Sequence, residues 1–247
     1  TLQQPDGTSA GGNNRGSNAV DLQLFRNFAT EVASGQYSFA SGYACISSGI
    51  ASSAMGSGSE ATAANAFAIA GGTASGADSF AWGGVASGLA ACALGFYAYA
   101  EIPYKFSFNS GGWWAGVNGA SPLLGLLIVS QLTTNATQTE LKTDQSTNSV
   151  CTLRNNSTYA FKILVSARRT DADGENDAWE FTGLIHRDAN AASTTLDALQ
   201  ENHIGSTEWS VSVDADTTNG SLRIQATGAA SKTIRWCATI QTTEVTE

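Results

Sequence analysis

The chain has 247 residues and a formal net charge of −9, with 12 basic residues against 21 acidic ones. Neither half of the sequence is basic, so a protein that binds nucleic acid by neutralising its phosphates is not expected. The longest apolar run, residues 123–129, is far shorter than the roughly 20 residues that cross a membrane, so we expect no membrane insertion.

An eleven-residue pattern, x-[AS]-[SA]-[GN]-x-x-[SA]-x-Ala-x-Gly, recurs within the first hundred residues and follows what we expect to be a flexible N-terminal arm, residues 1–16. The copies cover residues 32–42, 46–56, 62–72, 73–83 and 85–95. Their central alanines, which are 14, 16, 11 and 12 residues apart, are Ala40, Ala54, Ala70, Ala81 and Ala93. Self-similarity at so short a period predicts a stacked repeat in which each unit contacts mainly its neighbours.

Each copy ends in S-x-A-x-G or a close variant, and this alternation is typical of a strand. One face of that strand carries only small residues, which the inside of a tight coil requires. The other face carries two rows of mostly larger residues. The first row is Phe39, Ser53, Ile69, Phe80 and Cys92, and the second is Ser41, Met55, Gly71, Trp82 and Leu94.

A coil of one layer cannot cover these two rows, so the pattern predicts an apolar stripe that binds a partner surface. A flexible linker is the alternative for a stretch rich in Gly, Ser and Ala. The aligned alanines and the aromatic residues favour a folded shaft instead. The side chains that we expect in the core of a self-assembly are Phe39, Met55, Ile69, Phe80, Trp82 and Leu94.

Residues 85–95, Val-Ala-Ser-Gly-Leu-Ala-Ala-Cys-Ala-Leu-Gly, resemble the head repeats of trimeric autotransporter adhesins (the YadA-like head), whose signature is A-x-A-x-G-x-x-S-x-A-x-G. The same repeats occur in phage tail fibres and spikes, often after a G-x-x-A-V-D-L-Q segment similar to residues 16–23. The resemblance covers residues 16–100 and implies a left-handed parallel β-roll that packs as an obligate homotrimer. The uneven spacing, Asn65 in place of a glycine and an insertion at 57–61 leave the number of coils open.

A glycine-rich connector separates this shaft, residues 17–101, from a second domain, residues 123–247. The connector, residues 102–122, contains Trp113 and Trp114. Aromatic faces on a loop provide contact area for sugars or proteins, so these two tryptophans are candidate receptor contacts. The alternative is that they wedge the shaft against the second domain.

The second domain consists of short alternating segments with almost no helical pattern. A hairpin is expected from residues 209–213 and 222–226 around the Asn219-Gly220 turn. Eight or nine such strands predict an antiparallel β-sandwich, jelly-roll-like in outline. Residues 141–245 resemble C-terminal domains of phage and prophage tail or fibre proteins.

Few residues suggest chemistry. Residues 171–177 begin like a calcium loop, but Gly183 stands where the twelfth-position glutamate belongs, so we expect a solvated hairpin turn and no metal. His186, at a strand end, and His203, in an expected loop, are interpreted as structural. No cofactor is expected. A pair of carboxylates for sugar hydrolysis remains an alternative, because the sequence does not show how far apart two carboxylates lie in the folded protein.

These features together predict an all-β homotrimer that serves as a non-enzymatic phage tail-fibre or spike adhesin. We expect a virion protein, extracellular when functional, whose N-terminal arm contacts other virion proteins. Its tip would bind host surface polysaccharide, or another host glycan or protein. A capsid decoration or purely structural fibre is one alternative, and a tailspike enzyme that degrades glycans is the other.

Overall fold

The computed structural model describes residues 5–109, 123–144 and 150–246. The chain divides into two compact units, Thr1–Trp113 and Trp114–Glu247, and each is considered by itself. Regular structure in the described ranges is β-strand, apart from one three-residue 3-10 helix, η1 (Ala191–Ser193). No described helix has the length and apolar character of a membrane span. The prediction of an all-β chain is confirmed.

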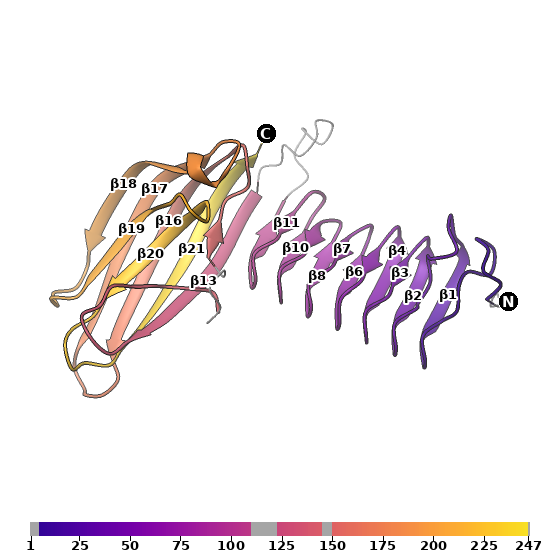
Figure 1. Ribbon diagram of the computed structural model, residues 1–247, viewed down its shortest axis with the longest axis horizontal. Coiled ribbons are helices and arrows are strands. Elements are labelled where there is room, and N and C mark those ends of the chain that lie inside the picture. Colours follow the sequence, from indigo (N-terminus) through magenta and orange to yellow (C-terminus); the bar gives the residue numbers. More distant parts are fainter. Residues whose placement is uncertain (1–4, 110–122, 145–149, 247) are drawn as a thin grey trace. The chain divides into compact units, whose positions relative to one another are not determined.

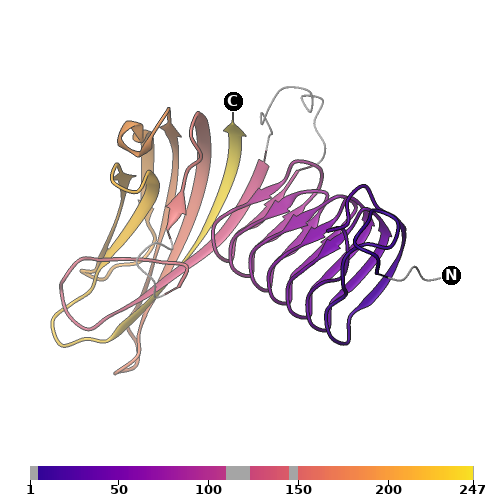
Figure 2. The same ribbon diagram turned by 45° about the vertical axis from the view of Figure 1, so that its right-hand side comes forward.

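Unit 1 is a β-solenoid of about six turns, built from two parallel sheets (Figures 1 and 2). The first sheet consists, in order, of β1 (Val20–Phe25), β2 (Phe39–Tyr43), β4 (Ser53–Ser57), β6 (Phe67–Ile69), β8 (Phe80–Trp82), β10 (Cys92–Leu94) and β12 (Phe106–Phe108). The second sheet consists of β3 (Ile46–Ser47), β5 (Glu60–Ala61), β7 (Thr73–Ala74), β9 (Val85–Ala86) and β11 (Tyr99–Ala100).

Two columns of small residues fill the interior of the solenoid. The first-sheet column is Ala40, Ala54, Ala68, Ala81 and Ala93. The second-sheet column is Ser47, Ala61, Ala74, Ala86 and Ala100. All ten residues have no exposed surface. Close approach of successive coils also explains the glycine of the motif, because a Cβ on Gly42 would collide with the backbone oxygen of Gly56.

The third repeat lies two residues earlier than the sequence pattern predicts. Phe67 pairs in register with Ser53 and Phe80, so Ala68 rather than Ala70 belongs to the alanine column. Ala70 instead closes its coil with a φ of 52°, in the left-handed region where the other copies use glycine. Because the sequence pattern requires a glycine at this position, it places the end of the third repeat at Gly72 instead of Ala70. With the correct register, the first-sheet strands from β2 to β12 start 14, 14, 13, 12 and 14 residues apart, and no insertion remains at 57–61.

Left-handed residues also mark the turn that leads into each first-sheet strand. Seven residues, each two positions before its strand, have φ between 50° and 62°: Asn18, Tyr37, Ala51, Asn65, Asp78, Ala90 and Tyr104. The amide of Asn65 donates a hydrogen bond of 2.9 Å to the carboxylate of Asp78 on the next coil. Asn65 thus occupies a left-handed turn position, where asparagine is favoured, and does not replace a glycine of the repeat.

Unit 2 contains two antiparallel sheets. The larger one has the order β13 (Leu123–Thr133), β21 (Ile234–Thr246), β16 (Ser157–Arg169), β17 (Asn176–Arg187) and β18 (Thr195–His203). In the smaller one, β20 (Ser221–Thr227) pairs with β14 (Thr139–Glu140), β15 (Cys151–Thr152) and β19 (Ser210–Asp216). The β19–β20 pairing confirms the hairpin predicted around Asn219-Gly220.

The core of unit 2 contains large aromatic side chains. The Trp236 ring lies 5.6 Å from that of Trp179 in its own sheet and 5.9 Å from that of Trp209, which immediately precedes β19. Its indole Nε1 donates a 2.9 Å hydrogen bond to Oγ1 of Thr133, so the polar atom is satisfied. Alternation along β16 buries Phe161, Ile163 and Val165, as the sequence pattern predicts. Figure 1 shows β16 side by side with β17 and β21.

Candidate functional site

The outward face of the first sheet of unit 1 carries two parallel rows of side chains, which we call the apolar strip. Strand register defines both rows, since equivalent positions of successive coils pair directly. The first row is Val20, Phe39, Ser53, Phe67, Phe80, Cys92 and Phe106. The second row is Leu22, Ser41, Met55, Ile69, Trp82, Leu94 and Phe108.

Side chains of the apolar strip contact each other but stay open to water in the single chain. The rings of Phe67 and Phe80 stack with centroids 5.4 Å apart. Trp82 is nevertheless 53% exposed and Leu22 49%. Stacking along the strip therefore covers only part of each side chain, and the remaining apolar surface faces outward.

The interior of the solenoid offers little apolar burial to balance this exposure. Among the largest fully buried side chains of the described residues, Gln23 is the one that comes from unit 1, and the others lie in unit 2. A buried alanine contributes far less than the roughly 1.5–3 kcal/mol of a buried Leu, Ile or Phe. Apart from Val32 and Ile102, the large apolar side chains of unit 1 thus lie outside its core.

The six predicted core residues of the assembly all belong to the apolar strip. Phe39 and Phe80 lie in the first row, and Met55, Ile69, Trp82 and Leu94 lie in the second. Ile69 changes row relative to the sequence alignment, because the third repeat was read two residues late. Sequence reasoning missed Phe67 for the same reason. The candidate receptor contacts Trp113 and Trp114 lie outside the described residues.

A buried polar cluster closes the solenoid at β1. Asp21 has a side chain that is 2% exposed and forms ion pairs with Arg26 at 2.9 Å and Arg15 at 3.1 Å. The Gln23 amide donates to the backbone oxygens of Glu31 and Cys45 and accepts from the Cys45 amide. The Asp and Gln of the A-V-D-L-Q segment thus satisfy the polar groups of the first coil.

His203 is the last residue of β18, which corrects its predicted position in a loop. Its Nε2 lies 2.9 Å from Asp177, and its ring stacks on Trp179 with centroids 4.9 Å apart. Asp177 also accepts hydrogen bonds from the backbone and hydroxyl of Thr207. Burial alone would raise the pKa of Asp177, but the hydrogen bonds from Thr207 and His203 outweigh it and lower that pKa. We call this arrangement the Asp177 clamp.

His186 lies near the end of β17, where the sequence placed it. Its Nδ1 lies 2.7 Å from Asp197, and its Nε2 lies 4.0 Å from Asp188. The hydrogen bond that the ring donates to the Asp197 carboxylate raises the pKa of His186 above its usual value. Both histidines therefore have a carboxylate partner.

The acidic turn at 171–177 directs two of its four carboxylates toward basic residues. Arg169 pairs with Asp171 and Glu175, each at 2.8 Å, and Lys232 pairs with Glu175 at 2.6 Å. Asp177 points instead into its own clamp. Across the described part of the chain, no group of three or more His, Cys, Asp or Glu residues could hold a metal ion.

Comparison with known proteins gives no family assignment. No protein-family model matches the chain, and no curated protein matches it. Among solved structures, the fold is similar to gp49, a tailspike protein and capsular polysaccharide depolymerase from Acinetobacter baumannii bacteriophage Fri1. The identity is 11% and the TM-score 0.30, over 83% of this chain and 40% of that one. The aligned part of the chain thus spans less than half of that tailspike.

Proposed function

We propose that this protein is a homotrimeric, non-enzymatic phage tail-fibre or spike protein whose solenoid shaft presents unit 2 as a tip that binds host surface polysaccharide. The observation that carries the proposal is the apolar strip. It places at least one large apolar side chain from every first-sheet strand on one outward face, over an interior built mainly from alanine.

Burial energetics favour association of the shaft. Full burial of an exposed Leu, Ile or Phe is worth about 1.5–3 kcal/mol. Trp82 is 53% exposed and the other five predicted interface side chains are partly exposed, so covering all six adds a few kcal/mol per chain. Net stability of a domain is only about 5–15 kcal/mol, so even a few kcal/mol lost by leaving the strip in water is a large share of it. Association of copies through the strip recovers this contribution, and the isolated shaft would not fold.

The number of chains follows from the repeats rather than from the energetics. Two-fold pairing also covers a stripe. The resemblance to YadA-like heads favours three left-handed rolls packed around one axis. In this arrangement the two sheets of unit 2 form a β-sandwich tip, and residues 1–16 contact other virion proteins.

The first measurement is the mass of the purified protein by light scattering. We expect three times the chain mass of 25.5 kDa. A well-folded monomer would refute the proposal, and a stable dimer would keep the burial argument while refuting the trimer.

The second measurement is binding to polysaccharide from the host surface, followed by analysis for released fragments. We expect binding without fragments. Absence of binding would favour a structural fibre or capsid decoration, and release of fragments would favour a glycan-degrading tailspike.

A further inference from the structure

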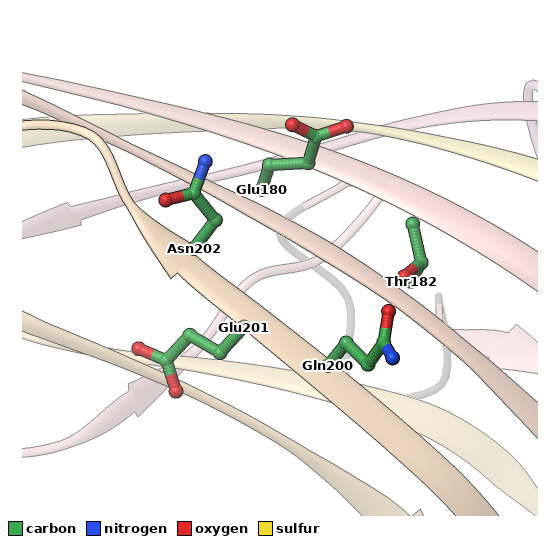
Figure 3. A pocket seen from close by; sticks show the side chains of 5 residues that line it. All are labelled: Glu180, Thr182, Gln200, Glu201 and Asn202. Carbon is green, nitrogen blue, oxygen red and sulfur yellow. The ribbon is translucent and has the colours of Figure 1, made fainter.

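A polar hollow of about 570 Å³ lies on β17 and β18 of unit 2. Two of its lining residues, Glu180 and Thr182, come from β17, and three consecutive ones, Gln200, Glu201 and Asn202, come from β18. Figure 3 shows these five side chains around the two strands. All five are polar, so no described side chain of the lining is apolar.

Strand register sets four of these side chains in a compact array. Glu180 pairs with Asn202, and Thr182 pairs with Gln200. Directly opposed residues of an antiparallel pair have Cβ atoms roughly 5 Å apart, and alternate residues of a strand are about 7 Å apart. All four side chains belong to one sheet face, so their polar groups lie close enough together to contact a single ligand.

Most of these polar groups have no hydrogen-bond partner among the described side chains. Glu180 pairs with Lys162 of β16, whereas the structure shows no side-chain hydrogen bond for Thr182, Gln200 or Asn202. Each amide offers two N–H donors and an acceptor oxygen, and the hydroxyl of Thr182 can donate or accept a hydrogen bond. The array thus presents donors and acceptors to a ligand rather than to the protein.

The strands that carry the array are held by the Asp177 clamp. His203, directly after Asn202, is bonded to Asp177 and stacked on Trp179 of the neighbouring strand. The stack has an interplanar angle of 4°. β18 is an edge strand whose residues are largely exposed, so burial does little to hold it in place. The Asp177 clamp fixes the end of this strand instead. Binding groups on rigid elements lose less freedom when a ligand binds.

We infer that this hollow is a saccharide-binding site that prefers neutral sugars, and the inference rests on the proposed role of unit 2 as a glycan-binding tip. Sugar hydroxyls act as donor and acceptor at once, which suits a lining of amides, a hydroxyl and carboxylates. An apolar ligand or a protein hot spot would need apolar or aromatic anchors.

Charge selects among saccharides. Glu180 and Glu201 both line the hollow, and the nearby Lys162 is already paired with Glu180. The chain as a whole carries a net charge of −9. An acidic sugar would therefore meet like charge and find no unpaired cation in the lining.

The test uses the full-length protein on immobilised oligosaccharides of hexoses and N-acetylhexosamines, with matched oligosaccharides that contain uronic acid. The test variant is Gln200→Ala with Asn202→Ala, two exposed side chains without a structural partner. The control is Gln241→Ala, an exposed amide on the same face of the same sheet but on β21. We expect wild type to bind neutral sugars, the test variant to bind about tenfold more weakly, and the control to match wild type.

The other outcomes show whether this site alone is wrong or the proposed function is wrong as well. Binding that survives in the test variant would refute this site and leave the glycan-binding tip in place. Absence of binding by wild type to every oligosaccharide would refute both. A preference for the uronic acid series that the test variant loses would overturn the assignment to neutral sugars. Thermal unfolding at the wild-type temperature shows that the test variant is folded.

Discussion

Asp21 lies in register with Ala40 and occupies the end of the column that alanine fills in the next five coils. An alanine in place of Asp21 would leave the N-terminal end of this alanine column open to water. Asp21 and Arg26 instead place a buried ion pair over it, with side chains that are 2% and 0% exposed. Repeat proteins need such a polar end, because a terminal unit lacks a neighbour on one side.

Asp21→Asn should therefore destabilise the solenoid strongly. The substitution keeps the shape of the side chain but removes the buried negative charge that pairs with both Arg26 and Arg15. Loss of one partner of a buried pair costs about 3 kcal/mol. Urea unfolding and hydrogen exchange of the β1 and β2 amides would measure the loss. The control is Asp78→Asn, which alters an exposed carboxylate of the same solenoid and should cost under about 0.5 kcal/mol. Equal effects of the two substitutions would contradict the capping role.

Ala81→Leu should disrupt the shaft, because Ala81 is fully buried between Ala68 and Ala93. Added methylene groups in a close-packed interior cost about 1–3 kcal/mol, and here the backbones of adjacent coils limit relaxation. Ala64→Leu makes the same change at an exposed position and should leave stability nearly unchanged. Midpoints of thermal unfolding for both variants check this. A wild-type midpoint for Ala81→Leu would mean that the interior holds more space than the alanine columns imply.

The sequence predicts the solenoid well because its constraints are local and repeated. Small residues inside and larger ones outside follow from the alternation alone, as Ala40 and Phe39 show. The error in the third repeat came from treating glycine as obligatory. Ala70 adopts a positive φ of 52° because the stacked coils on either side determine the backbone there, and no pattern of residue types reveals that.

The candidate sites of unit 2 were less accessible to sequence reasoning. The strand β18 reads Thr-Leu-Asp-Ala-Leu-Gln-Glu-Asn-His, which is polar and only weakly alternating. Its pairing with β17 brings Asn202 opposite Glu180 and His203 opposite Trp179, residues more than 20 positions apart in the chain. Such long-range register depends on tertiary packing, so neither the Asp177 clamp nor the polar hollow could be predicted.

Replacement of Phe80 and Trp82 together by Asp should abolish assembly and folding of the shaft at once. Two charges on adjacent rows of the apolar strip cannot be buried against another chain without a large desolvation cost. Light scattering and circular dichroism of the double variant give the two readouts. Ile50→Asp is the matched control, because Ile50 is an apolar residue of unit 1 that is 57% exposed and lies off the strip. A double variant that still forms the wild-type assembly would show that the strip is not the interface.

The pair of His186 and Asp197 should make stability depend on pH. The folded state raises the pKa of His186, so it holds the proton more tightly than the unfolded chain does. The stabilisation is therefore complete below the ordinary histidine pKa of about 6.5 and is lost as the pH rises through the higher folded value. Because both side chains are about one-third exposed, the change is limited to about 1 kcal/mol or less.

Urea unfolding of the full-length protein between about pH 5.5 and 8.5, followed by fluorescence of the buried tryptophans of unit 2, measures this loss. Asp197→Asn should flatten the curve by removing the main cause of the raised pKa. Asp188→Asn changes a carboxylate that is 74% exposed and 4.0 Å from the ring, so its curve should stay close to that of wild type. If wild type and Asp197→Asn lost stability in parallel with rising pH, another group would be responsible for the slope.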